Sequence, residues 1–377
     1  MRIYPFQAIY PNFNYIASPD SFFGRVKYEY PQYKESGFFL KAAQESVYIY
    51  RIEKINRTYI GLVASSDIND YMDGRIKKHE NTLASKEQQQ MHLMITRSAI
   101  VKPVLLTYPV VPEITHILKK YIQKHPPFYQ TVFTKEKQTH TFWEVSDGKI
   151  IQRLQKLFLE KVPETYIADG HHRTSTTALM YKRSQSEEEN KRNESAMEGN
   201  YHRLLSAFFQ TDQLDIHDYN RVVEGLNDCS LTTFMAKISQ LFDIELLEGP
   251  ARPAVKHEIV MFVNKEWFLL RWKKKVLKQY VKETVVLDAS LLDEKVLKPI
   301  LGIEDIRTDQ RIKYVEGPKG LDDIRSKAIK NINRVAFILY PVELMDLIKV
   351  ADLGMTMPPK STWFEPRIKN GLIVQEL

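Results

Sequence analysis

The stretch Tyr166-Ile167-Ala168-Asp169-Gly170-His171-His172-Arg173-Thr174-Ser175-Thr176-Thr177-Ala178-Leu179 organises the chain. The apolar approach from Thr165 to Ala168 predicts the end of a buried strand, and the segment from Ala178 onward predicts a helix. Gly170 allows a sharp turn between them, and the free N–H groups at the helix start favour an anion such as a phosphate. A carboxylate, two imidazoles and a guanidinium are costly to bury together, so this turn is the first candidate site.

Two other interpretations of the turn remain open. Asp169 could simply cap the helix while Arg173 forms a surface ion pair, which would make the cluster structural. Asp and His are also metal ligands, so a transition-metal site is a third interpretation. Adjacent residues rarely reach one ion together, however, and neither HxxxH nor HxH spacing is present. The interpretation as a functional site is favoured.

The composition predicts a soluble globular protein with two or three domains or one large elaborated domain. The chain has 377 residues, 43% hydrophobic and 27% charged. A net charge of +7 and a pI near 9.0 suggest nucleic-acid binding, but the Lys and Arg residues are spread along the chain and no basic arm or zinc-finger spacing occurs. The same positive field suits an anionic small substrate, such as a phosphate ester or a nucleotide.

Cysteine content and apolar segments indicate a cytoplasmic protein. Cys229 is the one cysteine in the sequence, which excludes an internal disulfide and fits a reducing compartment. The start, Met1 to Phe6, has no apolar core of a signal peptide, and the apolar stretch Val335 to Val350 is interrupted by charged residues. No membrane partner is expected. A homo-oligomer is compatible with the sequence.

The pattern of elements predicts an α+β protein with a mixed or antiparallel sheet core and a second α+β section. The expected division is an N-terminal domain over 1–212, a second domain over 213–345 and a C-terminal tail over 346–377 that folds back on the site. Four prolines predict loops and short extended pieces up to Gly37, and Gly148 to Gln152 is expected as a strand. The charged segment Ser184 to Asn200 is expected as a solvated loop or frayed helix end.

A second cluster is His79-Glu80-Asn81-Thr82, just before a predicted helix. Glu80 is a candidate general base, because a carboxylate in a partly dry cleft can be tuned towards neutral pKa. Equally, Thr82 or Asn81 could cap the helix while His79 and Glu80 face water.

A third cluster lies in the tail, Met357-Pro358-Pro359-Lys360-Ser361-Thr362-Trp363-Phe364. Lys360, Ser361 and Thr362 could hold a phosphate, although they lack the preceding glycine frame of a P-loop. The alternative is a docking tail whose aromatic side chains fill a groove.

These clusters resemble a family of bacterial and archaeal proteins, domain of unknown function 1015 (DUF1015). The resemblance rests on four stretches that span nearly the whole chain: Gly61-Leu62-Val63 with Asp70-Tyr71, His79-Glu80-x-Thr82, Ala168-Asp169-Gly170-His171-His172-Arg173, and Met357-Pro358-x-Lys360-Ser361-Thr362-x-Phe364. Many members continue the central turn with an aromatic and an acidic residue, where this chain has Thr174-Ser175. A helper role for that acidic position is therefore not carried over.

The Asp-Gly-His-His-Arg turn is also similar, more distantly, to that of ParB/sulfiredoxin-like proteins, including free serine kinases. This resemblance implies ParB/sulfiredoxin-like elements in the fold, a nucleotide such as ADP or ATP, and Mg²⁺. It implies that Asp169 holds Mg²⁺ or the substrate hydroxyl, that His171, His172 and Arg173 neutralise phosphoryl oxygens, and that Glu80 is the base. The other residues expected to bind phosphate or substrate are His79, Thr82, Gly170, Thr174, Lys360, Ser361 and Thr362.

The expected function is therefore Mg²⁺-dependent phosphoryl transfer on free serine or O-phosphoserine, in the kinase or the phosphate-removing direction. An association of the family with serine biosynthesis makes phosphoserine a sensible ligand. One alternative is a nucleotide-binding regulatory module without turnover, which would need no base. Another is a ParB-like nucleic-acid-binding protein, which the scattered basic residues disfavour.

Overall fold

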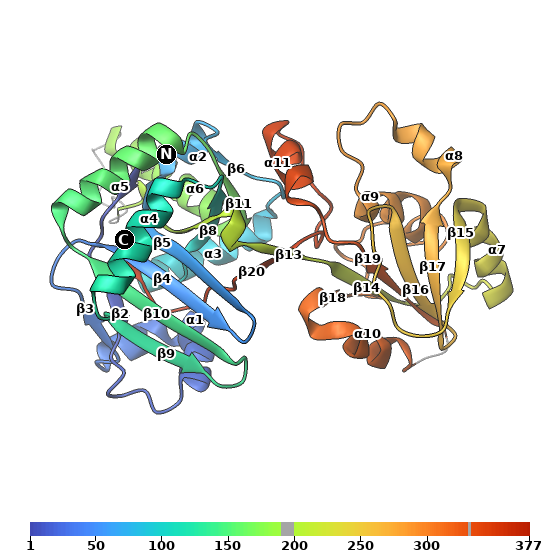
Figure 1. The fold of residues 1–377 in the computed structure, drawn as a ribbon, viewed down its shortest axis with the longest axis horizontal. Coiled ribbons are helices and arrows are strands. Elements are labelled where there is room, and N and C mark those ends of the chain that lie inside the picture. The colour runs from blue at the N-terminus through green and yellow to red at the C-terminus, as the bar shows by residue number, and fades with distance from the viewer. Residues whose placement is uncertain (190–199, 331–332) are drawn as a thin grey trace. The chain divides into compact units, whose positions relative to one another are not determined.

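The computed structural model describes residues 1–189, 200–330 and 333–377 (Figure 1). The chain forms two compact units. Unit 1 comprises Met1–Asp215 and Pro366–Leu377, and unit 2 comprises Ile216–Glu365. The chain thus leaves unit 1, builds the whole of unit 2 and then returns to unit 1 for its last segment. The three-part division expected from the sequence stays a prediction.

Unit 1 is built on a mixed sheet. Within the described residues its nine strands follow the order β6-β11-β8-β12-β5-β4-β10-β9, with β1 paired to β5. The pairs β11–β6 and β12–β8 are parallel and the others are antiparallel, which confirms the predicted α+β class. The strands are β1 (Ile3–Tyr4), β4 (Val47–Lys54), β5 (Arg57–Asp67), β6 (Ile76–Lys77), β8 (Val104–Tyr108), β9 (Tyr129–Phe133), β10 (Gln138–Val145), β11 (Thr165–Asp169) and β12 (Arg203–Gln210). Two short pairs accompany them, β2 (Ile9–Pro11) with β3 (Phe39–Lys41) and β7 (Ala99–Ile100) with β21 (Gln375–Glu376).

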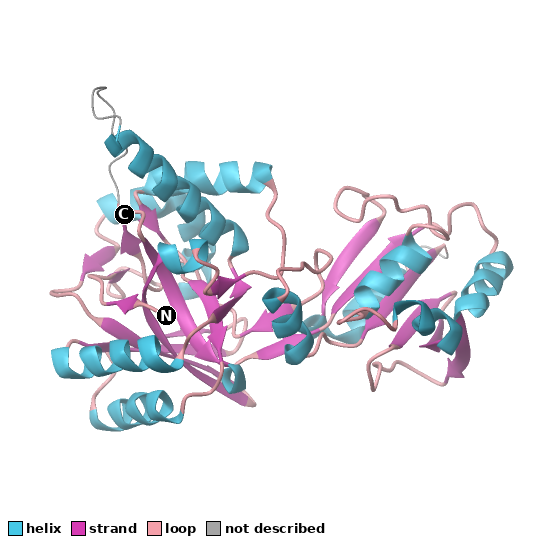
Figure 2. Ribbon diagram, turned by 90° about the horizontal axis from the view of Figure 1, so that it is seen from above, coloured by secondary structure: helices cyan, strands magenta, loops and turns pink. Residues whose placement is uncertain are grey.

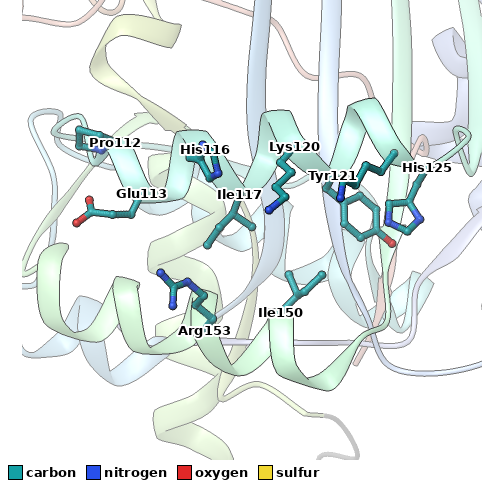
Figure 3. A pocket seen from close by; sticks show the side chains of 10 residues that line it. Pro112, Glu113, His116, Ile117, Lys120, Tyr121, His125, Ile150 and Arg153 are labelled. Carbon is teal, nitrogen blue, oxygen red and sulfur yellow. The ribbon is translucent and has the colours of Figure 1, made fainter.

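Helices lie on both sides of the strands of unit 1 (Figure 2). They are α1 (Pro19–Glu35), α2 (Ile68–Met72), α3 (Ala84–Arg97), α4 (Pro112–Lys124), α5 (Gly148–Lys161) and α6 (His171–Glu189), with a 3-10 turn over Thr211–Gln213. The apolar faces of α4 and α5 pack on the sheet through buried side chains such as Leu118 and Phe158. Between these two helices a groove of about 740 Å³ remains, bordered by His116, Tyr121 and Arg153 (Figure 3). It contains none of the predicted site residues.

Two segments of unit 1 differ from the sequence-based prediction. The stretch expected as loops contains α1, because Pro19 occupies the first turn, where no N–H partner is needed, and Ser18 accepts the N–H of Ser21. The expected strand from Gly148 is instead the start of α5, since Asp147 accepts the N–H groups of Lys149 and Ile150. Helix α6 extends to Glu189, so the start of the charged segment, expected as a solvated loop or a frayed helix end, is helical. Positions 190–199 of that segment lie outside the described residues.

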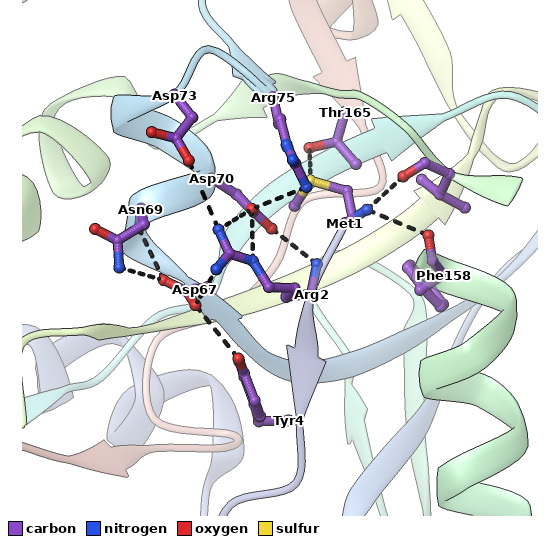
Figure 4. Close-up of polar contacts among 11 residues, drawn as sticks. Met1, Arg2, Tyr4, Asp67, Asn69, Asp70, Asp73, Arg75, Phe158 and Thr165 are labelled. Carbon is purple, nitrogen blue, oxygen red and sulfur yellow. Dashed lines mark hydrogen bonds and ion pairs between the residues drawn. The ribbon is translucent and has the colours of Figure 1, made fainter. Parts of the chain in front are cut away.

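The first residues of the chain fasten β1 to the core of unit 1 (Figure 4). The Met1 ammonium donates to the carbonyls of Phe158 and Val162, at 3.2 and 2.6 Å. The fully buried Asp70 carboxylate accepts from the Arg2 backbone N at 2.8 Å, from Nε at 3.0 Å and from Nη2 at 2.7 Å. Asp70, one of the residues that carry the family resemblance, therefore has a structural role here.

Unit 2 is built on an antiparallel sheet. Within the described residues its six strands follow the order β15-β17-β16-β19-β14-β18. They are β14 (Tyr219–Glu224), β15 (Phe242–Leu247), β16 (Glu258–Val263), β17 (Glu266–Trp272), β18 (Ile312–Glu316) and β19 (Arg334–Leu339), beside a separate pair of β13 (Asp215–His217) and β20 (Trp363–Glu365). Side chains of α7 (Leu231–Leu241) and α9 (Asp288–Leu292) share one core cluster with the sheet, and those of α10 (Gly320–Ala328) share another. The remaining helical pieces are α8 (Lys274–Leu277), α11 (Leu344–Asp352), a π-helical turn (Asp293–Leu297) and 3-10 turns over Lys278–Tyr280 and Gly317–Lys319.

No helix in the described parts of the chain has the length and apolar character needed to span a bilayer.

The contact between β5 and β12 leaves no space for a side chain at Gly61. A Cβ at this position would lie 2.6 Å from the Phe208 carbonyl oxygen, which belongs to the neighbouring strand and cannot move without breaking the sheet.

We expect Gly61→Ala to lower the free energy of unfolding by about 1–3 kcal/mol. Gly24→Ala is the matched control: Gly24 lies in α1 with open space around it, so alanine should stabilise by about 0.5–1 kcal/mol. Urea unfolding followed by circular dichroism measures both, and equal effects of the two substitutions would contradict the packing argument.

We expect Asp293 in unit 2 to make the protein less stable as the pH rises through 6. Burial raises its pKa to about 6, against the opposing charge of Arg221, and neither carboxylate oxygen has a hydrogen-bond partner among the described residues. Because the pKa is raised in the folded state, the protonated form contributes stability that is complete below the ordinary value of 3.8 and is lost as the pH rises through 6. Asp293→Asn should therefore raise the free energy of unfolding at pH 7 by on the order of 2–3 kcal/mol, and this advantage should shrink towards pH 4.

Urea unfolding of the Asp293 variant at pH 7, 5 and 4 measures this effect. Asp243→Asn, at an exposed position of β15, is the control and should change stability little at each pH. An Asp293→Asn variant that is no more stable than the native chain at pH 7 would contradict the prediction.

Candidate functional site

The turn between β11 and α6 has the strand–turn–helix form predicted from the sequence. The pairing of β11 with β8 shifts register between Ile167 and Asp169, and Gly170 adopts a φ of +115°. A Cβ at Gly170 would lie 2.7 Å from the Arg173 Nη2 atom, so glycine lets this guanidinium approach the backbone. The Gly170 carbonyl accepts the N–H of Thr174 at 3.0 Å and its hydroxyl at 3.2 Å, which fixes the first turn of α6.

Asp169 is surrounded by three cations. Its Oδ2 atom accepts from Lys102 Nζ at 2.9 Å and from Arg173 Nη2 at 3.0 Å, and its Oδ1 atom lies 3.4 Å from Arg367 Nη1. Burial alone would raise the pKa of Asp169, but the charges of Lys102, Arg173 and Arg367 hold it well below the ordinary value. The carboxylate is therefore ionised, and the cluster carries two more positive charges than negative ones.

Lys102 and Arg367 were not predicted from the sequence. Burial lowers the pKa of Lys102 to about 8, although the Asp169 carboxylate acts in the opposite direction. Arg367 comes from the segment that returns to unit 1, which is held by a bond from the Gly371 N–H to the Val101 carbonyl at 2.6 Å and by the pairing of β21 with β7. Both residues are far from Asp169 in the chain, so no local pattern indicated them.

A pair of buried histidines lies beside the turn. The rings of His79 and His171 meet edge to face, with centroids 4.5 Å apart. Burial lowers the pKa of His79 to about 4 and, with the neighbouring His79, holds that of His171 well below its usual value. Both rings are therefore neutral at pH 7. His171 therefore adds no positive charge to the site. The contact with phosphoryl oxygens that the resemblance gave to His171 stays a prediction.

Glu80 lies at the open side of the histidine pair. Its Oε2 atom is 3.8 Å from His171 Nδ1, and its side chain is 39% exposed. Among the described residues, His171 Nε2 is buried without a hydrogen-bond partner. The structure thus brings the second predicted cluster to the first, and places a partly exposed carboxylate next to a buried imidazole.

Thr82 and His172 lie near Glu87 at the contact between α3 and α6. The Thr82 hydroxyl donates to Glu87 Oε1 at 2.6 Å, and hydrogen bonds from Thr82 and Ser175 lower the pKa of Glu87, with a smaller contribution from His172. Thr82 therefore tethers the start of α3. Thr174 is fully buried, with its hydroxyl on the Gly170 carbonyl. The substrate contacts expected of Thr82, His172 and Thr174 stay predictions.

The third predicted cluster belongs to unit 2. Lys360 adopts a φ of +58° and its Nζ lies 5.2 Å from the centroid of the Tyr219 ring. Ser361 is buried and donates to the Pro358 carbonyl at 2.7 Å, and Thr362 follows it. These three residues and the Asp169 turn thus lie in different units. A phosphate contact by Lys360, Ser361 and Thr362 stays a prediction.

A metal site is not evident in the residues themselves. In the residues that the structure describes, no group of three or more His, Cys, Asp or Glu side chains is placed to hold an ion. Both oxygens of Asp169, the predicted magnesium ligand, already face cations. The donor set at the turn therefore does not fit a resident metal ion.

Comparison with known proteins places the chain in one family. Residues 9–290 match the family described as "Protein of unknown function (DUF1015)", and the chain belongs to it. This confirms the resemblance inferred from the sequence motifs. No curated protein matches the sequence.

Solved structures of low sequence identity align with the chain. SbnI from Staphylococcus aureus, with a C-terminal truncation, is 11% identical with a TM-score of 0.41, covering 82% of this chain and 85% of that one. A free serine kinase variant in complex with AMP is 13% identical with a TM-score of 0.39, covering 82% and 92%. A conserved hypothetical protein from Pyrococcus furiosus is 12% identical with a TM-score of 0.39, covering 86% and 97%.

The lowered pKa of Lys102 can be tested by chemical labelling. Only the neutral amine is nucleophilic, so labelling of Lys102 by a small acylating reagent should have its midpoint near pH 8, well below the ordinary lysine value of 10.5. Asp169→Asn removes the charge that supports the ammonium, so it should shift the midpoint to lower pH. Mass spectrometry of the Lys102 peptide measures this, with exposed Lys119 as the internal reference in the same digest. A midpoint near 10.5 would refute the assigned environment.

Proposed function

We propose that this DUF1015 protein is a phosphoryl-transfer enzyme that acts on a small metabolite, with free serine and O-phosphoserine as the expected acceptor and product. The proposal rests on one observation: a buried carboxylate at a strand-to-helix turn is surrounded by more cations than it can neutralise. The nucleotide, ADP or ATP, is included because the Asp169–Arg173 turn resembles that of free serine kinases.

The surplus positive charge suits the chemistry of phosphoryl transfer. In this reaction the enzyme mainly positions its substrates and stabilises negative charge on the three equatorial oxygens of the transferred group. Lys102 and Arg173 are fixed by Asp169 before any substrate binds, so they need little rearrangement. Asp169 itself is a positioning group here, because its ionised oxygens hold the cations in place.

The neutral histidines and Glu80 supply groups for proton transfer. A neutral imidazole can donate one N–H, and the buried Nε2 of His171 is suitable either as a donor to a phosphoryl oxygen or as an acceptor. In the kinase direction, Glu80 takes the proton from the serine hydroxyl as the new O–P bond forms and the bond to the nucleotide breaks. In the reverse direction Glu80 returns that proton to the leaving serine oxygen. Its partial exposure allows a substrate to reach it.

Magnesium has no step in this proposal, because the described residues do not form a metal site. In many enzymes Mg²⁺ is held largely by the phosphates of the nucleotide, with few protein carboxylates. The Mg²⁺ dependence expected from the resemblance is therefore tested as one arm of the assay, by adding a chelator.

The test is phosphorus NMR of the purified protein with ATP and serine, and separately with O-phosphoserine with and without ADP. We expect a phosphomonoester signal to appear or disappear with time in a nucleotide-dependent manner. Glu80→Gln should lower the rate by about 10²–10⁴-fold, the usual contribution of a general base, while nucleotide binding persists. Asp169→Asn should abolish turnover, because the cations lose their common partner.

Matched substitutions at surface positions provide the controls. Asp147→Asn keeps a helix-capping side chain at the start of α5, and Glu160→Gln changes an exposed side chain of the same helix; both should retain the native rate. Nucleotide binding without turnover in every mixture would reject the enzyme and support the regulatory module. Turnover unchanged by Glu80→Gln would exclude Glu80 as the base.

A further inference from the structure

A small cationic cavity adjoins the Asp169 cluster. It has a volume of about 180 Å³, and its lining residues include four basic ones, Lys27, Arg97, Lys102 and Arg173. The other lining residues are the amides Gln90 and Asn370 and the apolar residues Met94, Ala99, Ile100 and Val101. No carboxylate is among the described side chains that line it. We refer to it as the basic cavity.

The walls of the basic cavity come from segments that are distant in the sequence. Lys27 belongs to α1, Arg97 ends α3, and Lys102 precedes β8. Arg173 lies in the first turn of α6, and Asn370 lies in the segment that returns after unit 2. The fold thus gathers four cations from four separate segments, and Asn370 comes from a fifth.

Two of the four cations are incompletely paired. Arg97 is only 9% exposed, and its Nη2 donates to the Lys27 carbonyl, but its buried Nε has no hydrogen-bond partner among the described residues. The buried Nε of Arg173 also has none within the described parts of the chain. Burial lowers the pKa of Arg97 to about 10, so the guanidinium remains charged at neutral pH. A buried charge without a counter-ion is costly, and this cost is removed when an anion binds.

The size and lining of the basic cavity limit the ligand. Its volume is below the ~300–1,000 Å³ usual for drug-sized ligands, and no described lining residue is aromatic, so a nucleobase has neither space nor a stacking partner. Several fixed cations and no acid select a compact ligand with at least two negative charges. The two amides can bind a neighbouring hydroxyl or carbonyl group.

We propose that the basic cavity binds the phosphate group of a small phosphorylated metabolite, with Lys27 and Arg97 as specificity-determining residues that lie outside the Asp169 cluster. This inference rests on the proposed function and names its substrate class as compact phosphomonoesters. Lys102 and Arg173 face both the cavity and Asp169, so a bound phosphate lies next to the reacting centre. Free phosphate and pyrophosphate share the same chemistry and are compared directly.

The experiment is isothermal titration calorimetry of the full-length chain with inorganic phosphate, pyrophosphate, O-phosphoserine, serine and AMP, at constant ionic strength. We expect O-phosphoserine to bind at least tenfold more tightly than serine, and Lys27→Gln and Arg97→Gln each to weaken its binding at least tenfold. Arg25→Gln changes an exposed cation of the same helix as Lys27 and should leave the affinity unchanged. Tighter binding of pyrophosphate or inorganic phosphate than of O-phosphoserine would overturn the assignment of a metabolite.

Labelling of Lys102 provides a readout that does not depend on turnover. An anion in the cavity stabilises the ammonium, so saturating O-phosphoserine should move the labelling midpoint of Lys102 to higher pH. If Arg97→Gln fails to fold, Lys27→Gln decides. The proposal would be overturned if the folded Lys27→Gln variant bound O-phosphoserine as tightly as the native chain and showed the same shift of the Lys102 labelling midpoint with O-phosphoserine. This holds even if the enzyme turns over. Binding that follows the prediction without any turnover would support the cavity and reject the phosphoryl-transfer function alone.

Discussion

The ionised carboxylate of Asp169 is the interaction on which the site depends. The charges of Lys102, Arg173 and Arg367 offset the cost of burying this carboxylate. In turn, Asp169 offsets the cost of holding each of these cations in a partly buried position. The arrangement is reciprocal, so none of the four residues can be understood alone. The same arrangement gives the site a net positive charge, because three cations surround the single negative charge of Asp169. A site with this charge favours an anionic ligand.

The glycine at the turn and the histidine pair follow from the same constraint. Gly170 lets Arg173 fold back to Asp169, since a Cβ at this position would collide with the guanidinium. His79 and His171 are kept neutral by burial, which avoids two further positive charges beside the cluster. The site therefore separates fixed positive charges, held by Asp169, from the buried neutral histidines and the partly exposed Glu80 beside them. Such a division suits a reaction in which charge must be stabilised and a hydroxyl must lose its proton.

The sequence predicted the local features of this arrangement and missed the distant ones. The strand, the glycine turn and the helix are consecutive in the chain, so hydrophobic pattern and residue type were sufficient to place Asp169 and Arg173. Lys102 and Arg367 meet Asp169 across 67 and 198 positions, and a lone lysine or arginine carries no sign of such a contact. The prolines before Gly37 do not predict α1, because Pro19 occupies its first turn, where proline is favourable, and Pro31 lies inside the helix. Motif residues also differed in role: Asp70 anchors Arg2, whereas Asp169 organises the candidate site.

The return of the chain to unit 1 has a consequence for biosynthesis. A ribosome adds about 5–20 residues per second, so the whole of Ile216–Glu365 is made, over roughly eight to thirty seconds, before Arg367 and Asn370 follow. Throughout that interval a nascent unit 1 has Asp169, Lys102 and Arg173 but lacks its third cation and one wall of the basic cavity. The segment that follows unit 2 thus completes the site, and unit 1 reaches this form only after the synthesis of unit 2.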